Sequence, residues 1–222
     1  NKKEKTGIIE LAQASGIQLV AKELRNPTKT TSYGTGELIA KAISDGMVKI
    51  ILFIGGSATN DVGIGMLDAL GFFFSDSKNK KLKASVKNLS KISKIGKSPI
   101  YDNIKKIKFI VACDVDNPLI GPNGATQIFG KQKGASDEEI YELEEKVIHF
   151  SKIVTKELKT DYTRHKGAGA AGGVGFAALS FFNAEFEGGF ELISKLLNLK
   201  DKIKKGNYLS LIHISEPTRR RG

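Results

Sequence analysis

The feature that most constrains this sequence is an apolar run that ends abruptly in glycines and small polar residues. Residues 49–54 read KIILFI. A run of this length bounded by glycine is typical of a strand buried on both faces of a parallel sheet. The group that follows is larger than a simple turn needs: Gly55, Gly56, Ser57, Thr59, Asn60 and Asp61. The pattern therefore predicts a strand end that holds a ligand, or a tight strand-to-helix turn in which Ser57 or Asn60 caps the next helix.

Further apolar runs alternate with amphipathic segments along the chain. Lys108–Cys113 predicts a second buried strand. Ser136 and Glu139 form a capping-box pattern before apolar residues at helical spacing through Leu158, which predicts a long helix. Shorter helices are predicted at Ile8–Ala14, Thr35–Asp45, Gly63–Leu70, between the glycines of 167–175 and Phe182, and at Phe190–Leu199, with loops and short elements over Lys78–Asp102. This alternation predicts an α/β fold.

The composition is that of an ordinary globular protein. The chain has 222 residues, 40% hydrophobic and 27% charged, which allows one large domain or two small ones and argues against disorder. Cys113 is the only cysteine, so the chain forms no intramolecular disulfide, as expected in a reducing compartment. No apolar stretch reaches the roughly 18 residues of a membrane span, and the first residues do not resemble a signal peptide. We therefore expect a cytoplasmic protein with no membrane partner.

The net charge of +11 raises the question of nucleic-acid binding. However, the lysines are spread along the chain, with one denser zone from Lys78 to Lys108, and aromatic residues do not alternate with them. A stacking surface for nucleic acid needs such aromatics. We expect a lysine-rich solvated surface and no nucleic-acid partner.

Acidic residues follow the second apolar run. Asp114, Asp116 and Asn117 come directly after it, and residues two apart in an extended backbone project to the same side. Two adjacent carboxylates are costly unless a cation or hydrogen bonds compensate, and Mg²⁺ bound to phosphate would do so. Alternatively, one aspartate is a turn residue before Pro118 and the pair points to solvent.

Two glycine-rich segments are further candidates for phosphate contacts. Gly167, Gly169 and Gly172 match the dinucleotide-binding pattern, but no strand precedes them, so they predict a backbone cradle for phosphate or a helix packed closely through its glycines. Lys131 and Lys133 lie between Gly130 and Gly134 in a segment that is not a P-loop, because Gln132 stands where Ser or Thr would bind Mg²⁺. These lysines either supply charge to a phosphate or are ordinary loop charges.

Taken together and in this order, the motifs resemble the bacterial glycerate kinase family. The similarity covers about Ile8 to Tyr208 and is carried by five segments: Thr31–Ile39, Gly55–Asp61, Ala112–Leu119, Phe129–Ala135 and Gly167–Gly173. The resemblance is to type 1 glycerate 2-kinases. It implies a two-domain α/β protein with a cleft between the domains, which transfers the γ-phosphoryl group of ATP to D-glycerate and gives 2-phosphoglycerate.

The resemblance implies ATP, Mg²⁺ and glycerate as ligands, and we add roles for residues in its shared loops. The expected catalytic residues are Asp61, Asp114 and Asp116. Asp114 and Asp116 are also the expected metal ligands, with contact to the glycerate hydroxyl as the alternative role for either. The expected substrate and phosphate contacts are Gly55, Gly56, Ser57, Thr59, Asn60, Asn117, Lys131, Lys133, Gly167, Gly169 and Gly172.

Departures from the family pattern affect these expectations. The Asp-Ser-Phe-Lys-Gly segment near the start of family members and the Gly-Glu-Gly motif after Tyr208 are absent. We expect residues 1–208 to be the central part of a kinase with both domains incomplete, truncated at both ends, and the fragment alone to be inactive. Residues 209–222 resemble a translated sequencing-adapter sequence. A homo-oligomer is left open, and the alternative function is a non-catalytic sugar-acid or anion-binding α/β module.

Overall fold

The computed structural model describes residues 4–97 and 104–205. The chain divides into two units, Asn1–Gly189 and Phe190–Gly222, and each is described by itself. Within the described part of the second unit, α8 (Gly189–Leu196) continues from the first unit and α9 (Leu199–Lys205) follows. The first unit contains both sheets and every residue of the site described below.

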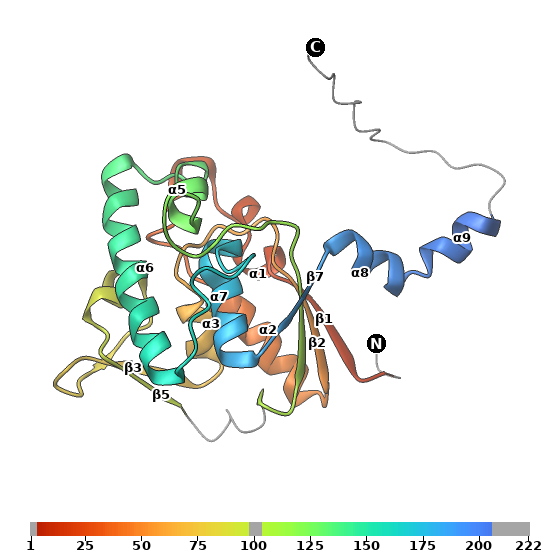
Figure 1. Cartoon of the computed structure of the whole chain (residues 1–222), viewed down its shortest axis with the longest axis horizontal. Coiled ribbons are helices and arrows are strands. Elements are labelled where there is room, and N and C mark those ends of the chain that lie inside the picture. Colours follow the sequence, from red (N-terminus) through yellow and green to blue (C-terminus); the bar gives the residue numbers. More distant parts are fainter. Residues whose placement is uncertain (1–3, 98–103, 206–222) are drawn as a thin grey trace, which may run out of the picture. The chain divides into compact units, whose positions relative to one another are not determined.

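The first unit is built on a parallel sheet of the order β1-β2-β6-β7 (Figure 1). Its strands are β1 (Thr6–Glu10), β2 (Lys49–Phe53), β6 (Lys108–Ala112) and β7 (Glu185–Glu187). The last residues of the first three strands are level, because Glu10 pairs with Phe53 and Phe53 pairs with Ala112. The segments that follow these strands therefore leave from the same edge of the sheet, where ligands bind in open α/β folds.

Helices cover the sheet and enclose the core. In the first unit these are α2 (Tyr33–Ser44), α3 (Ile64–Ala69), α6 (Asp137–Leu158) and α7 (Ala170–Phe182). Figure 1 shows α7 between the parallel sheet and α6, and α7 contacts β6. Phe109 of β6 stacks on Phe182 of α7 with ring centroids 4.6 Å apart. The buried side chains of the sheet and of these helices form one hydrophobic cluster.

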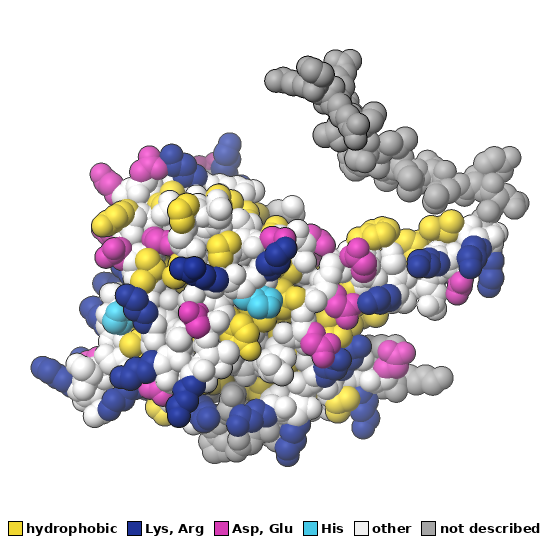
Figure 2. Space-filling view, viewed as in Figure 1, with side chains coloured by type: hydrophobic (Ala, Val, Ile, Leu, Met, Phe, Trp, Pro, Cys, Tyr) yellow, Lys and Arg dark blue, Asp and Glu magenta, His cyan; other side chains and the backbone are white. Residues whose placement is uncertain are grey.

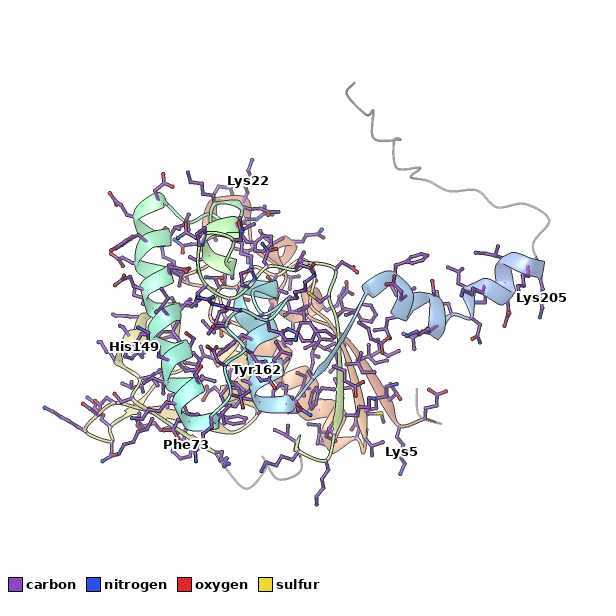
Figure 3. All side chains as sticks on the ribbon, in the orientation of Figure 1. Lys5, Lys22, Phe73, His149, Tyr162 and Lys205 are labelled. Atoms are coloured by element: carbon purple, nitrogen blue, oxygen red, sulfur yellow. The ribbon has the colours of Figure 1, made fainter. Side chains whose placement is uncertain are left out.

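A second, antiparallel sheet of the order β4-β3-β5 lies against the helices. It consists of β3 (Phe72–Ser75), β4 (Lys81–Leu82) and β5 (Lys94–Lys97). The short helix η3 (Val86–Lys91) lies between β4 and β5 in the sequence and contacts α6. Phe74 meets Phe150 of α6 edge to face, with centroids 5.9 Å apart. His149, labelled in Figure 3, pairs its Nε2 with the carbonyl of Ile92 at 2.8 Å. These contacts anchor α6.

Short helical elements complete the part of the chain that the structure describes. They are α1 (Ala12–Ser15), η1 (Ile17–Leu19), η2 (Lys22–Leu24), α5 (Ala125–Phe129) and η4 (Lys131–Lys133). Lysines and arginines are scattered over the face drawn in Figure 2, with acidic side chains between them. None of the helices among residues 4–97 and 104–205 has both the length and the apolar character needed to cross a bilayer.

The mixed α/β architecture predicted from the sequence is confirmed, as are the two buried strands and the capping box. The Ser136 hydroxyl accepts the Glu139 N–H, and the Glu139 carboxylate accepts the Ser136 N–H. The predicted helix at Ile8–Ala14 is wrong: residues 6–10 form strand β1, and only Ala12–Ser15 is helical. The apolar residues at positions 8, 9 and 11 fit the spacing of a strand and that of a helix. Parallel pairing with β2 makes the segment a strand. Strand β7 was not predicted.

Candidate active site

A cavity of about 740 Å³ opens at the carboxyl edge of the parallel sheet. We call it the strand-end cavity. Its walls come from the ends of β1, β2 and β6, from α1 and η1, from the end of α5 and η4, and from the start of α7. Among its lining residues are Glu10, Gln13, Phe53, Gly55, Gly56, Ser57, Cys113, Asp114, Phe129, Gln132, Lys133, Ala170 and Ala171.

The loop after β2 forms one wall of the cavity. Gly56 has a φ of +70°, a conformation that glycine adopts at little cost. Its carbonyl accepts the Ile17 N–H at 2.9 Å, and the Ala58 N–H donates to the Ser15 carbonyl at 2.9 Å. A Cβ added at Gly55 would meet nothing within 4 Å, so packing does not require glycine there. Backbone bonds thus hold the loop while Gly55 leaves room in the cavity.

Lys133 brings a buried positive charge to this wall. Its side chain lines the cavity although the residue is only 7% exposed. The Nζ atom donates to the Ser57 hydroxyl at 2.7 Å and to the Thr59 carbonyl at 2.6 Å. Burial lowers the pKa of the Lys133 amine from 10.5 to about 8, and the negative charge of Asp61 acts in the opposite direction. An ammonium has three N–H donors, so one remains for a ligand.

Thr59, Asn60 and Asp61 lie behind the cavity rather than in it. All three are at most 1% exposed and none lines the cavity. The Asp61 carboxylate accepts the N–H and hydroxyl of Ser32, at 2.8 and 2.9 Å, and the N–H groups of Gly63 and Gly65. Burial raises the pKa of Asp61 against the effect of these bonds. In this arrangement Asp61 joins the start of α2 to the turn before α3, and its catalytic role stays a prediction.

The remaining polar atoms of this buried group are only partly paired. The Asn60 amide nitrogen donates to the Thr126 hydroxyl at 3.0 Å, whereas its Oδ1 has no partner in the described part of the chain. The Thr59 hydroxyl lies 3.4 Å from the Ala171 carbonyl that accepts its hydrogen bond. These contacts tie the loop after β2 to α5 and α7.

The structure separates the two aspartates that the sequence placed together. Asp114 lines the cavity and its Oδ1 accepts the Gly189 N–H at 2.7 Å. Asp116 does not line it, and its carboxylate pairs with Lys166 at 2.8 Å. The alternation rule fails here because β6 ends at Ala112, so both aspartates lie beyond regular strand backbone. The described residues contain no group of three or more His, Cys, Asp or Glu side chains able to hold a metal ion.

The glycines of residues 167–172 act through packing. A Cβ at Gly169 would lie 2.2 Å from the Pro118 carbonyl oxygen, and one at Gly172 would lie 2.0 Å from the Thr59 carbonyl oxygen. A Cβ at Gly167 would lie 2.8 Å from the ring of Phe186. None of these glycines lines the cavity, which Ala170 and Ala171 reach instead. Their absence of side chains lets α7 approach the loops after β2 and β6.

Two other predicted contacts lie outside the cavity. Lys131 is exposed and forms an ion pair with Asp137 at 2.8 Å. The Asn117 side chain donates to the Asn123 carbonyl at 2.9 Å, and its own carbonyl accepts the Gly169 N–H. Asn117 therefore shapes the loop after β6.

The sequence did not point to Glu10, Gln13 or Gln132, which all line the cavity. Glu10 is the last residue of β1, so the same strand-end argument that selected Ser57 and Asp114 would have selected it. The apolar spacing of Ile8–Ala14 also fits a helix, which conceals this strand end in the sequence.

The fold and the cavity define an α/β protein with a ligand-sized site at a sheet edge. The site is lined by the buried Lys133 amine, by the carboxylates of Glu10 and Asp114, and by the glycine-bearing loop after β2. The model of the glycerate kinase family matches residues 1–211, and the chain belongs to that family. It is 45% identical over 199 residues to glycerate 2-kinase of Escherichia coli K12, covering 90% of this chain and 52% of that protein. It is 42% identical to glycerate kinase of Halalkalibacterium halodurans, with coverages of 92% and 54%.

A solved structure agrees with these relatives. A crystal structure described as glycerate kinase 2 from Salmonella typhimurium LT2 matches with a TM-score of 0.85 and 38% identity, over 91% of this chain and 54% of that one. The chain thus spans about half the length of the relatives it matches.

Proposed function

We propose that this chain forms the phosphate-binding part of an enzyme that transfers the γ-phosphoryl group of ATP to D-glycerate and yields 2-phosphoglycerate. The observation that carries the proposal is the buried Lys133 amine in the strand-end cavity, fixed against Ser57 and Thr59. Phosphoryl transfer depends mainly on positioning and on neutralising the charge of phosphate oxygens. Because the chain spans about half of its relatives, activity of the whole protein is part of the proposal.

The residues of the cavity divide this work. Lys133 binds an anionic oxygen with its remaining N–H, and the Ser57 hydroxyl, which accepts from Lys133, is free to donate its own hydrogen. Gly55 and Gly56 let a phosphate or carboxylate approach the backbone. Asp61, Thr59 and Asn60 keep the loop in place from behind, which makes them positioning residues.

Asp114 fits a magnesium site better than Asp116 does. Its Oδ2 has no hydrogen-bond partner among the described residues, and the residue lines the cavity. Mg²⁺ needs only one or two protein carboxylates when phosphates and water complete its shell. When bound, the metal would neutralise phosphate charge. Asp116, paired with Lys166, is not needed for this.

Calorimetry on the 222-residue chain tests the proposal. We expect saturable binding of D-glycerate, and ATP binding that tightens when Mg²⁺ is added. ATP binding that ignores Mg²⁺ would instead indicate a non-catalytic anion-binding module, and a folded chain that binds neither ligand would refute the proposal. An ATP-dependent glycerate phosphorylation assay on a full-length protein containing this segment tests the reaction itself.

A further inference from the structure

Glu10 places a free carboxylate in a cavity otherwise suited to anions. It is the last residue of edge strand β1 and lines the strand-end cavity. Its Oε2 accepts the Gln13 amide at 3.0 Å, which orients the carboxylate. In the part of the chain that the structure describes, Oε1 has no partner and no cation pairs with Glu10. A bare carboxylate opposes the binding of phosphate or glycerate unless it receives a hydrogen-bond donor or a cation.

Glu10 and Asp114 line the same cavity but have different protein partners. The two residues leave β1 and β6, which flank β2, so their strands are about 10 Å apart. The Asp114 carboxylate is bonded to Gly189, which follows β7 on the far side of β6 from β1. Glu10 instead accepts a hydrogen bond from Gln13 on α1. We therefore assign the two carboxylates to different groups.

Hydroxyl donors are the natural partners of such a carboxylate. Each carboxylate oxygen accepts two hydrogen bonds, so Glu10 can receive two neighbouring hydroxyls while keeping Gln13. The Gln13 amide oxygen adds an acceptor beside it. We propose that Glu10, oriented by Gln13, recognises a vicinal diol in the strand-end cavity, as a specificity-determining residue of the proposed kinase. The inference rests on that proposed function. Both D-glycerate and the ribose of ATP carry this chemistry.

Matched ligand pairs distinguish the two sources. Calorimetry without metal compares D-glycerate with D-lactate, which lacks the 3-hydroxyl, and ATP with 2′-deoxy-ATP. In the unmodified chain, loss of the hydroxyl should weaken one pair's binding about 10-fold or more, the usual effect of losing a hydrogen bond to a charged group. Glu10→Gln should reduce that difference to a few-fold, because its amide oxygen still accepts a hydrogen bond but carries no charge. The pair that responds identifies the diol as that of glycerate or of ribose.

The matched control for Glu10→Gln is Glu23→Gln. Glu23→Gln makes the same chemical change on an exposed residue of η2 outside the cavity, and should leave the preference intact. Because Glu10 is exposed, its variant should fold, which circular dichroism checks. Equal binding within both pairs, or a preference that is undiminished in Glu10→Gln, would overturn this inference alone. If ATP binding by Glu10→Gln no longer depends on Mg²⁺, Glu10 is a metal ligand, and the inference is overturned as well. Binding of neither ATP nor glycerate by the unmodified chain would refute the proposed function and this inference together.

Discussion

Replacing Lys133 with methionine separates its cost to folding from its use in binding. Methionine keeps an unbranched apolar stem of similar length and removes the charge. Because the pKa of Lys133 falls from 10.5 to about 8, keeping the amine charged in the folded protein costs about 3 kcal/mol. Removing it leaves the Thr59 carbonyl and the Ser57 hydroxyl without that donor, which costs about 1–3 kcal/mol. The two terms nearly cancel.

The expected result is a variant that folds as well as the parent but binds anions poorly. The free energy of unfolding in urea should change by less than about 2 kcal/mol, while affinity for ATP falls roughly 10- to 100-fold through the lost charged hydrogen bond. Lys131→Met is the matched control, since Lys131 is exposed and paired with Asp137 outside the cavity. Severe destabilisation of the Lys133 variant with undiminished ATP affinity would show that the amine is structural and refute this reasoning.

Three further results are expected. Affinity for anionic ligands should fall as the pH rises through about 8, because deprotonation of Lys133 removes its charge, and titration calorimetry should find no such step in Lys133→Met. Gly172→Ala should destabilise the protein by about 3 kcal/mol or more in thermal unfolding, because its Cβ would lie 2.0 Å from a carbonyl oxygen at a φ of +65°, whereas Gly55→Ala should fold normally. Asp114→Asn should abolish the effect of Mg²⁺ on ATP binding and Asp116→Asn should preserve it; the opposite pattern would reverse our metal assignment.

Long local patterns made most of the fold predictable from the sequence. The apolar run of β2 lies buried in the middle of the sheet, and the capping box at Ser136 is a local arrangement that needs no tertiary information. Strand β1 lies at the sheet edge with Ile8 exposed, so its pattern is ambiguous between strand and helix. Its assignment as a strand depends on pairing with β2, which lies about 40 residues further along the chain, so a local sequence pattern cannot predict it.

The candidate site was predictable only as far as the position of the strand ends. Gly55, Ser57, Asp114 and Lys133 do line one cavity. Packing determines which polar residues face the cavity and which lie behind it. Asp61 lies in the same loop as Ser57, yet its carboxylate accepts a hydrogen bond from Ser32. Spacing alone does not contain that information.

The most direct test of the central claim is a crystal structure of this chain with Mg²⁺, a non-hydrolysable ATP analogue and D-glycerate. We predict an anionic oxygen within hydrogen-bond distance of the Lys133 Nζ, beside Ser57 in the strand-end cavity. Ligands bound elsewhere, for example in the hollow beside Glu144 and Arg164, with Lys133 contacting only protein, would contradict the account.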